Sequence, residues 1–217
     1  MLEIRTYVGK GFSQNAYLIW QSDSKDAIAL DPGADAPSMV AALESNQLKL
    51  QTILLTHAHL DHIEGVAHLK RHADVPIYMH PDDAQFYDNA HVQAAQFGMQ
   101  VEKLPPVDMQ LHDGQQLNLA GITLDVYHVP GHCPGHVIFY VKDAKTAFVG
   151  DVVFQGSIGR TDLPGGSYQV LMQSIRDHVM TLPDDTVLYS GHGPETTVGE
   201  ERKSNPFIAP MYGGSFA

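Results

Sequence analysis

Runs of apolar residues recur along the chain and predict a mixture of strands and helices. Short runs rich in β-branched residues, bounded by turn residues, are typical of strands. We predict strands at Leu2–Val8, Ala16–Trp20, Ala27–Leu30, Thr52–Leu55, Val75–Met79, Gln115–Leu119, Ile122–Val129, Val137–Val141, Thr146–Val149 and Thr186–Ser190. Apolar residues three and four positions apart are typical of amphipathic helices. We predict helices at Pro37–Leu48, Asp61–His72, Asp82–Asn89 and Tyr168–Thr181, whereas His91–Leu104 fits neither pattern clearly.

The order of these elements predicts an α/β fold. Strands, a helix, a strand, a helix and a strand come first, and further strands, a helix and a last strand follow. Each amphipathic helix must bury its apolar face, so this order predicts two sheets sandwiched between helices, a four-layer αββα arrangement. No internal linker or fixed-period repeat interrupts the pattern, and residues 1–217 are therefore predicted to form a single domain.

Composition narrows the choice of partners and compartment. The 217 residues are 43% hydrophobic and carry a formal net charge of −12, which disfavours a nucleic-acid partner because phosphates require a basic surface. Cys133 is the only cysteine, so no intrachain disulfide is expected. The chain has no secretory signal pattern and no apolar stretch of membrane-spanning length. A cytoplasmic protein that does not enter the membrane is the resulting expectation.

The strongest chemical signal is Thr56-His57-Ala58-His59-Leu60-Asp61-His62, which follows a predicted strand and begins a predicted helix. Alternate side chains of an extended segment share a face, so His57 and His59 can bind one metal ion together. Asp61 and His62 lie at the turn into the helix and are expected to reach a second ion. The alternative reading makes Asp61 a helix N-cap, with Glu64 completing a capping box. Three histidines and an aspartate within six residues favour metal binding.

Three later segments share one form, an apolar strand that ends in a ligand-type residue beside glycine. The residues at these strand ends are His132, Asp151 and His192. Strand ends in a layered sheet converge on one edge, where loops carry function on a rigid scaffold. Taken singly, a His or Asp at a strand end is more often structural. Together with the first motif, the three residues indicate one shared site.

This pattern of His-x-His-x-Asp-His followed by spaced His, Asp and His resembles the metallo-β-lactamase superfamily, and in particular the bacterial glyoxalase II-like hydrolases. The resemblance runs from about Asn15 to His192. It is carried also by the stretches Gln14–Trp20, Pro130–His136, Phe148–Phe154 and Gly156–Gly166.

The resemblance implies a role for each of these residues. His57, His59 and His132 would bind a first metal ion, Asp61, His62 and His192 a second, and Asp151 would bridge the two. His136 is not a ligand in this pattern and is expected to support the site. Imidazole and carboxylate ligands suit zinc best, with iron or manganese as alternatives.

Two ions about 3.5–4 Å apart share one solvent oxygen and lower its pKa from about 15.7 to near 7, which supplies hydroxide at neutral pH. We expect this hydroxide to attack a carbonyl carbon, with Asp61 as a candidate for proton transfer. A thiol mechanism through Cys133 is the weaker reading, because the sequence places no evident base beside it.

A thioester is the expected substrate, because a thiolate leaves without a proton whereas an amine requires one. The resemblance implies hydroxyacylglutathione, such as lactoylglutathione, cleaved to a hydroxy acid and glutathione. Arg160 is the candidate substrate-binding residue, since a guanidinium suits a carboxylate; a salt bridge with Asp162 is the equal alternative. The longer glyoxalase II enzymes place two tyrosines and a C-terminal helical domain near glutathione. Asp162 and Pro194 occupy the matching positions here, with about 25 residues after His192.

Other activities remain open at this point. A mononuclear iron persulfide dioxygenase would use two histidines and one aspartate, and such enzymes carry a loop like Gly159–Asp162. A lactonase, a β-lactamase or another ester hydrolase of the same superfamily is a third reading. A nuclease is disfavoured by the net charge of −12.

Overall fold

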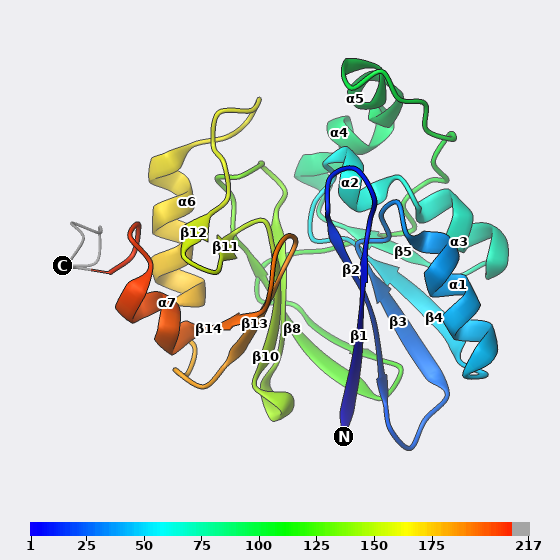
Figure 1. The fold of residues 1–217 in the computed structure, drawn as a ribbon, viewed down its shortest axis with the longest axis horizontal. Helices are drawn as coiled ribbons and strands as arrows, with labels where there is room; N and C mark the ends of the chain where they lie inside the picture. Colours follow the sequence, from blue (N-terminus) through cyan, green and yellow to red (C-terminus); the bar gives the residue numbers. More distant parts are fainter. Residues whose placement is uncertain (210–217) are drawn as a thin grey trace.

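The computed structural model describes residues 1–209. Two six-stranded sheets face each other, and helices cover the outer face of each (Figure 1). This is the four-layer α/β sandwich that the order of elements predicted. Among the described residues, no helix is both long and apolar enough to cross a membrane.

The first sheet has the strand order β1-β2-β3-β4-β5-β6. Its strands are β1 (Leu2–Val8), β2 (Asn15–Gln21), β3 (Asp26–Leu30), β4 (Lys49–Leu54), β5 (Ile77–Met79) and β6 (Met109–Gln110). The first three strands pair antiparallel, and β3 to β6 pair parallel. The helical segments of this half are α1 (Ala36–Ser45), α2 (Leu60–Ile63), α3 (Val66–His72), the 3₁₀ turn η1 (Pro81–Asp83), α4 (Ala84–Asp88) and α5 (Ala90–Gln96).

The second sheet has the strand order β14-β13-β10-β9-β8-β7. Its strands are β7 (Gln116–Leu119), β8 (Ile122–His128), β9 (Val137–Val141), β10 (Thr146–Gly150), β13 (Val187–Ser190) and β14 (Thr196–Thr197). β10 and β13 pair parallel. The remaining elements are the 3₁₀ turn η2 (Lys142–Ala144), the hairpin of β11 (Val153–Phe154) and β12 (Ser157–Ile158), α6 (Tyr168–Ser174), the π-helical turn η3 (Ile175–Val179) and α7 (Val198–Ser204).

The alternation of side chains along β2 explains why the first sheet is buried on both faces. Ala16 and Leu18 pack into the cluster beneath α1 and α3. Tyr17 and Ile19, the intervening residues, pack into the cluster between the two sheets, where Phe139 of β9 is fully buried. Successive side chains of a strand point to opposite faces, so one strand contributes to two cores.

The predicted helix Asp61–His72 is divided in the structure, and Gly65 shows why. The backbone N–H of Gly65 donates to the carbonyl of Pro32 at 2.8 Å rather than continuing a helical ladder. A Cβ at this position would lie 2.3 Å from the carbonyl oxygen of Gly33. The chain therefore interrupts the helix where two backbones approach each other, and α2 and α3 are separate.

Other boundaries also differ from the sequence prediction. The unclear segment 91–104 contains most of α5, and the predicted helix Tyr168–Thr181 ends in the π-helical turn η3. α7 was not predicted, because its sequence is mostly polar and lacks a clear apolar stripe. The predicted irregular tail from Pro206 lies mainly outside the described residues.

Candidate metal centre

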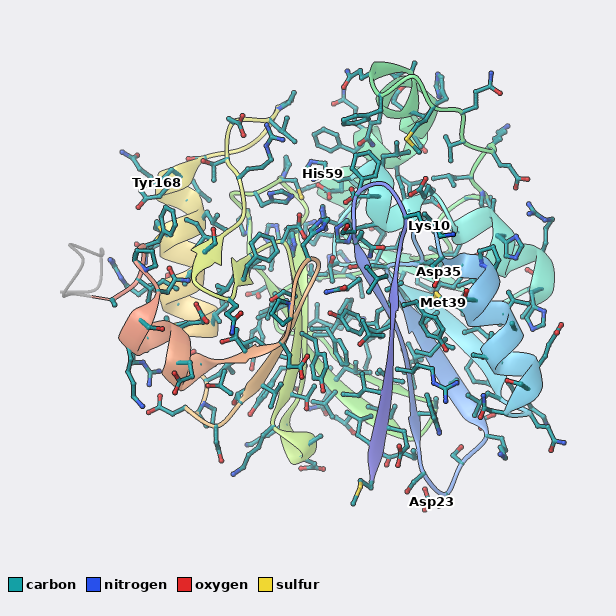
Figure 2. The ribbon with its side chains drawn as sticks, viewed as in Figure 1. Lys10, Asp23, Asp35, Met39, His59 and Tyr168 are labelled. Carbon is teal, nitrogen blue, oxygen red and sulfur yellow. The ribbon has the colours of Figure 1, made fainter. Side chains whose placement is uncertain are left out.

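The loop between β4 and α2 holds the first ligand-type residues. The loop begins at the end of a buried strand, and residue 59 is the N-cap of α2. His59 lies at the edge of the molecule between its two halves (Figure 2). Asp61 occupies the first turn of α2 and makes no capping box, because His59 takes the N-cap position without a side-chain hydrogen bond. The alternative reading of Asp61 as an N-cap is therefore wrong.

Two groups of side chains meet at this edge. Ligand-type atoms of His57, His59 and His132 all lie within 4.8 Å of one another. A second group, made by Asp61, His62 and His192, is equally close. The loops after β4, β8 and β13 bring these six residues together from both sheets. The structure thus assembles the two groups that the sequence analysis assigned to two ions.

Asp151 lies between the two groups. Its Oδ2 atom is 3.6 Å from Nε2 of His132 and 3.6 Å from Nε2 of His192. Its Oδ1 atom is 3.4 Å from Nε2 of His62. One carboxylate therefore faces both groups, which is the arrangement that a bridging ligand requires.

Unsatisfied polar atoms at the centre fit a pair of cations. Nε2 of His57, Nε2 of His62 and Oδ1 of Asp151 are buried and have no hydrogen-bond partner within residues 1–209. Buried polar atoms without partners are rare in folded proteins and call for a specific explanation. Imidazole nitrogens and a carboxylate, aimed inward from the segments after β4 and β10, are the donor set of a site for zinc or a neighbouring transition metal.

Three of the imidazoles, those of His57, His62 and His132, are oriented by a partner on the side away from the centre. Nδ1 of His62 lies 3.0 Å from Oδ2 of Asp31, and Nδ1 of His57 lies 3.0 Å from the hydroxyl of Thr56. Nδ1 of His132 donates to the backbone carbonyl of Arg160 at 2.8 Å. Such partners fix the ring tautomer and direct the other ring nitrogen toward the centre, where a metal ion would bind.

His136 supports the centre without belonging to either group. Its buried ring stacks on His57 at a centroid distance of 4.7 Å. Its Nε2 atom accepts a hydrogen bond from the backbone N–H of Asp151 at 3.0 Å. This contact holds the carboxylate-bearing backbone in place, as expected for a supporting residue.

Burial and charge set the protonation states at the centre. Burial and the neighbouring His132 lower the pKa of His59 to about 3, and burial also lowers the pKa of His57. Burial alone would raise the pKa of Asp151, but the facing imidazoles of His62 and His132 lower it below its ordinary value. His57 and His59 are therefore neutral and Asp151 is ionised. These are the forms of imidazole and carboxylate that bind metal ions.

Cys133 does not fit the role of a nucleophile. Its side chain is fully buried, and its Sγ donates to Oδ2 of Asp83 at 3.1 Å. A carboxylate partner is thus present that the sequence did not reveal. Burial and the charge of Asp83 raise the pKa of the thiol, so neither access nor ionisation favours attack.

A cleft of about 640 Å³ opens over the two groups. Its floor includes His59, Asp61 and His192, and its walls include aromatic side chains from the β1–β2 turn and from α4 and α5. A cavity of this size suits a small-molecule substrate. Ligand-type residues of both groups are therefore reachable from this cleft.

Arg160 lines this cleft, but its guanidinium is paired. Nε and Nη2 of Arg160 donate to the two carboxylate oxygens of Asp162 at 2.7 and 2.8 Å, and both side chains are exposed. The salt bridge that the sequence analysis held as the alternative is present. Substrate binding by Arg160 stays a prediction that is compatible with this pairing.

Three further residues around the centre, Asp31, Asp83 and Gln93, were not predicted from the sequence. Asp31 directly follows β3 and precedes Pro32-Gly33, so it has the same form as the other residues at strand ends, a signal that could have found it. Asp83 and Gln93 contact the ligand loops from η1 and α5, and no local pattern marks them.

Comparison with known proteins agrees with this geometry. Residues 9–192 match the metallo-beta-lactamase superfamily. The chain belongs to the metallo-beta-lactamase superfamily. Within that superfamily, hydroxyacylglutathione hydrolase GloC of Haemophilus influenzae is 42% identical over 204 residues, which cover 91% of this chain and 93% of that protein. The chain is therefore a metallo-hydrolase of this superfamily, with a site for divalent metal ions.

Solved structures of the superfamily share the whole fold. BLEG-1, described as a B3 metallo-beta-lactamase, superimposes with a TM-score of 0.90 at 36% identity, covering 95% of this chain and 100% of that one. TTHA1623 in a di-iron-bound form superimposes with a TM-score of 0.86 at 38% identity, covering 94% and 100%. The four-layer sandwich is thus the fold of the superfamily.

Proposed function

We propose that this metallo-hydrolase cleaves thioesters, with hydroxyacylglutathione such as lactoylglutathione as its substrate and a hydroxy acid and glutathione as products. The observation that carries the proposal is the complete seven-residue centre on the floor of the cleft. The likeness to GloC, which is named a hydroxyacylglutathione hydrolase, supports the choice of substrate.

The residues of the centre would act as ligands to two metal ions. His57, His59 and His132 would hold one divalent ion and Asp61, His62 and His192 the other, with Asp151 between them. Zinc suits these ligands best, and iron or manganese also fits. When bound, the ions lower the pKa of water towards neutrality and stabilise negative charge on a carbonyl oxygen.

Asp61 has a position suited to proton transfer. Its Oδ2 lies 3.2 Å from Nε2 of His192, and its side chain is among those lining the cleft. In the proposed reaction a water oxygen bonds to the acyl carbon, the carbon–sulfur bond breaks, and the sulfur leaves as a thiolate. Asp61 accepts the proton that the attacking water loses. A thiol has a pKa near 8.5, so no acid is needed at the leaving group.

The test is a substrate panel on the purified, metal-loaded protein. We expect hydrolysis of S-lactoylglutathione with kcat/KM in the ordinary range for enzymes, about 10⁴ M⁻¹s⁻¹ or more. The panel includes a β-lactam, a lactone and glutathione persulfide, with oxygen uptake recorded for the last. One iron per chain together with oxygen consumption would contradict the hydrolase proposal.

β-Lactam hydrolysis is the second candidate. The observation that favours it is the likeness to BLEG-1, which is described as a B3 metallo-beta-lactamase and covers 95% of this chain. An amine leaving group needs a proton at nitrogen, which makes this reaction more demanding for the same residues. A kcat/KM for a β-lactam above that for the thioester would reverse the order of the two candidates.

Replacing Arg160 with alanine is expected to raise KM for the thioester more than it lowers kcat, because Arg160 lines the cleft and is not a member of either group of ligand-type residues. The carbonyl of Arg160 that accepts from His132 remains in this variant. We expect a change in KM of roughly 5- to 30-fold, the effect of about 1–2 kcal/mol. Steady-state kinetics measure it.

Asp162→Ala is the matched control. This substitution frees the same guanidinium from its partner, so KM for a substrate that bears a carboxylate should fall or stay level. An equal loss of kcat in both variants would show that the loop matters for structure and that Arg160 does not hold substrate.

A further inference from the structure

The carboxylate of Asp83 joins two loops of the metal centre. The side chain is fully buried at the end of η1. Its Oδ2 accepts from the backbone N–H of Ala58 at 2.9 Å, and its Oδ1 accepts from the backbone N–H of Gly135 at 2.6 Å. The thiol of Cys133 donates to Oδ2 at 3.1 Å. One side chain therefore binds the β4–α2 loop and the β8–β9 loop together.

The positions of these three donors in the sequence matter. Ala58 stands between His57 and His59, and Cys133 follows His132 directly. The bonds to Asp83 thus connect the backbone segments that carry all three members of the first group. A buried carboxylate is costly unless it accepts hydrogen bonds, and here three donors from two loops compensate for its burial.

Gly135 is required for this arrangement. A Cβ at residue 135 would lie 2.6 Å from the backbone nitrogen of Asp83 and 2.8 Å from its carboxylate. Contacts this short do not occur for real side chains, so only glycine lets the β8–β9 loop come so near η1. The glycine at position 135 therefore permits the close approach of the β8–β9 loop to η1.

Gln93 of α5 holds the same loop from the other side. Its Nε2 donates to the carbonyl of Ala58 at 2.9 Å and to the carbonyl of Phe86 at 2.9 Å. Its Oε1 accepts from the backbone N–H of Leu60 at 3.1 Å. Ala58 and Leu60 are the neighbours of His59, so the amide of Gln93 fixes the backbone on both sides of that residue.

We propose that Asp83 and Gln93 are positioning residues that hold His59 and His132 in the geometry for the first metal ion. Neither side chain belongs to the groups of ligand-type residues. Their hydrogen bonds fix the backbone from which the imidazoles project, so the ligands are ordered before an ion arrives. Without these bonds, metal binding must itself order the loops, and the affinity falls by that cost.

The first experiment compares Gln93→Leu with Gln96→Leu, an equally neutral change at an exposed position one turn along the same helix. The metal-free proteins are titrated with Zn²⁺ in competition with a chromophoric chelator. We expect Gln93→Leu to bind one of the two ions about 10- to 100-fold more weakly, the usual effect of losing a residue that orients a ligand. Gln96→Leu should match the parent. His59→Ala and His192→Ala are titrated in the same way. Their binding curves show what the loss of one ligand from the first or from the second group looks like.

A merely structural role predicts a different result. In that case Gln93→Leu lowers the melting temperature of the metal-free protein but leaves both affinities equal to those of Gln96→Leu, and the proposal is overturned. A loss that follows the His192→Ala profile instead of the His59→Ala profile overturns it as well.

A second pair of variants tests Asp83 through its thiol donor without altering charge. Cys133→Ala removes a donor to the carboxylate, whereas Cys133→Ser replaces the thiol with a hydroxyl. We expect Cys133→Ala to weaken the first ion by about 3- to 10-fold, in line with one lost hydrogen bond, and Cys133→Ser to restore most of this loss. If Cys133→Ala binds the first ion as tightly as Cys133→Ser does, the role proposed for Asp83 is contradicted. This pair decides the matter if Gln93→Leu does not fold.

The proposal depends on the metal centre and not on the identity of the substrate. Metal affinity is measured without any substrate, whereas the proposed thioesterase activity is measured on fully loaded parent protein. The positioning role can therefore fail while the thioesterase activity is confirmed, and the reverse is equally visible.

Discussion

Replacing Asp151 with alanine is expected to abolish hydrolysis and to lower the bound metal in the same preparation. The carboxylate faces His62 at 3.4 Å and both His132 and His192 at 3.6 Å, so its loss removes a ligand from both groups at once. Metal ions contribute several kcal/mol to this kind of catalysis, and each 1.36 kcal/mol is tenfold in rate. We expect kcat/KM to fall by roughly a thousandfold or more.

Elemental analysis and thioester kinetics on one sample check this result. Asp23→Ala is the control, because Asp23 is exposed in the β2–β3 turn at the opposite end of the molecule (Figure 2). Wild-type turnover in Asp151→Ala would show that the residue does not bridge the two groups. Full metal content with lost turnover would show that it acts on substrate alone.

Removal of metal by a chelator should stop hydrolysis and lower the melting temperature. Ions that bind only the folded chain stabilise it by about 4 kcal/mol when free metal is a thousandfold above Kd. For a domain of this size each kcal/mol shifts the melting temperature by roughly 2–4 °C. We therefore expect a decrease of about 8–16 °C. The inward-facing atoms of His57, His62 and Asp151 are the groups that lose their partner.

Calorimetry and activity assays, before and after dialysis against the chelator, measure both effects. Readdition of Zn²⁺, Mn²⁺ or Fe²⁺ separately should restore activity to different extents and so identify the metal that works best. Activity that survives once elemental analysis finds no metal would exclude a metal-dependent mechanism.

The sequence predicted the layers well because burial and strand period leave a direct mark on it. β1 begins at Leu2 and ends at Val8 as predicted, since the turn Gly9-Lys10-Gly11 follows it directly. The break at Gly65 was not predictable, because it depends on the carbonyl groups of Pro32 and Gly33, which are distant in sequence. α7 was missed because a short, polar helix that packs through a few residues has no clear periodicity.

The candidate site was predictable to the extent that its residues stand at strand ends. His57 to His62 form a dense motif, and His132, Asp151 and His192 each follow a strand. Their proximity then follows from the topology of the two sheets. Asp83 and Gln93 were not predicted, because their partners are backbone groups of other loops. A backbone group has no sequence signature. The pairing of Arg160 with Asp162 was foreseen as one of two readings, since the residues are near neighbours.

Side-chain hydrogen bonds join β2 to the end of β13 and the loop that follows it, and they bear on the order of events during folding. Tyr17 donates its hydroxyl to the carbonyl of Ser190, and Asn15 donates to the carbonyls of Ser190 and Gly193. These contacts close a loop of most of the chain, which makes them late to form. Because these bonds hold the segment on both sides of His192, we expect a complete pair of cation sites only in a chain that has almost finished folding. Bound metal should then slow the unfolding reaction while leaving the refolding rate nearly unchanged.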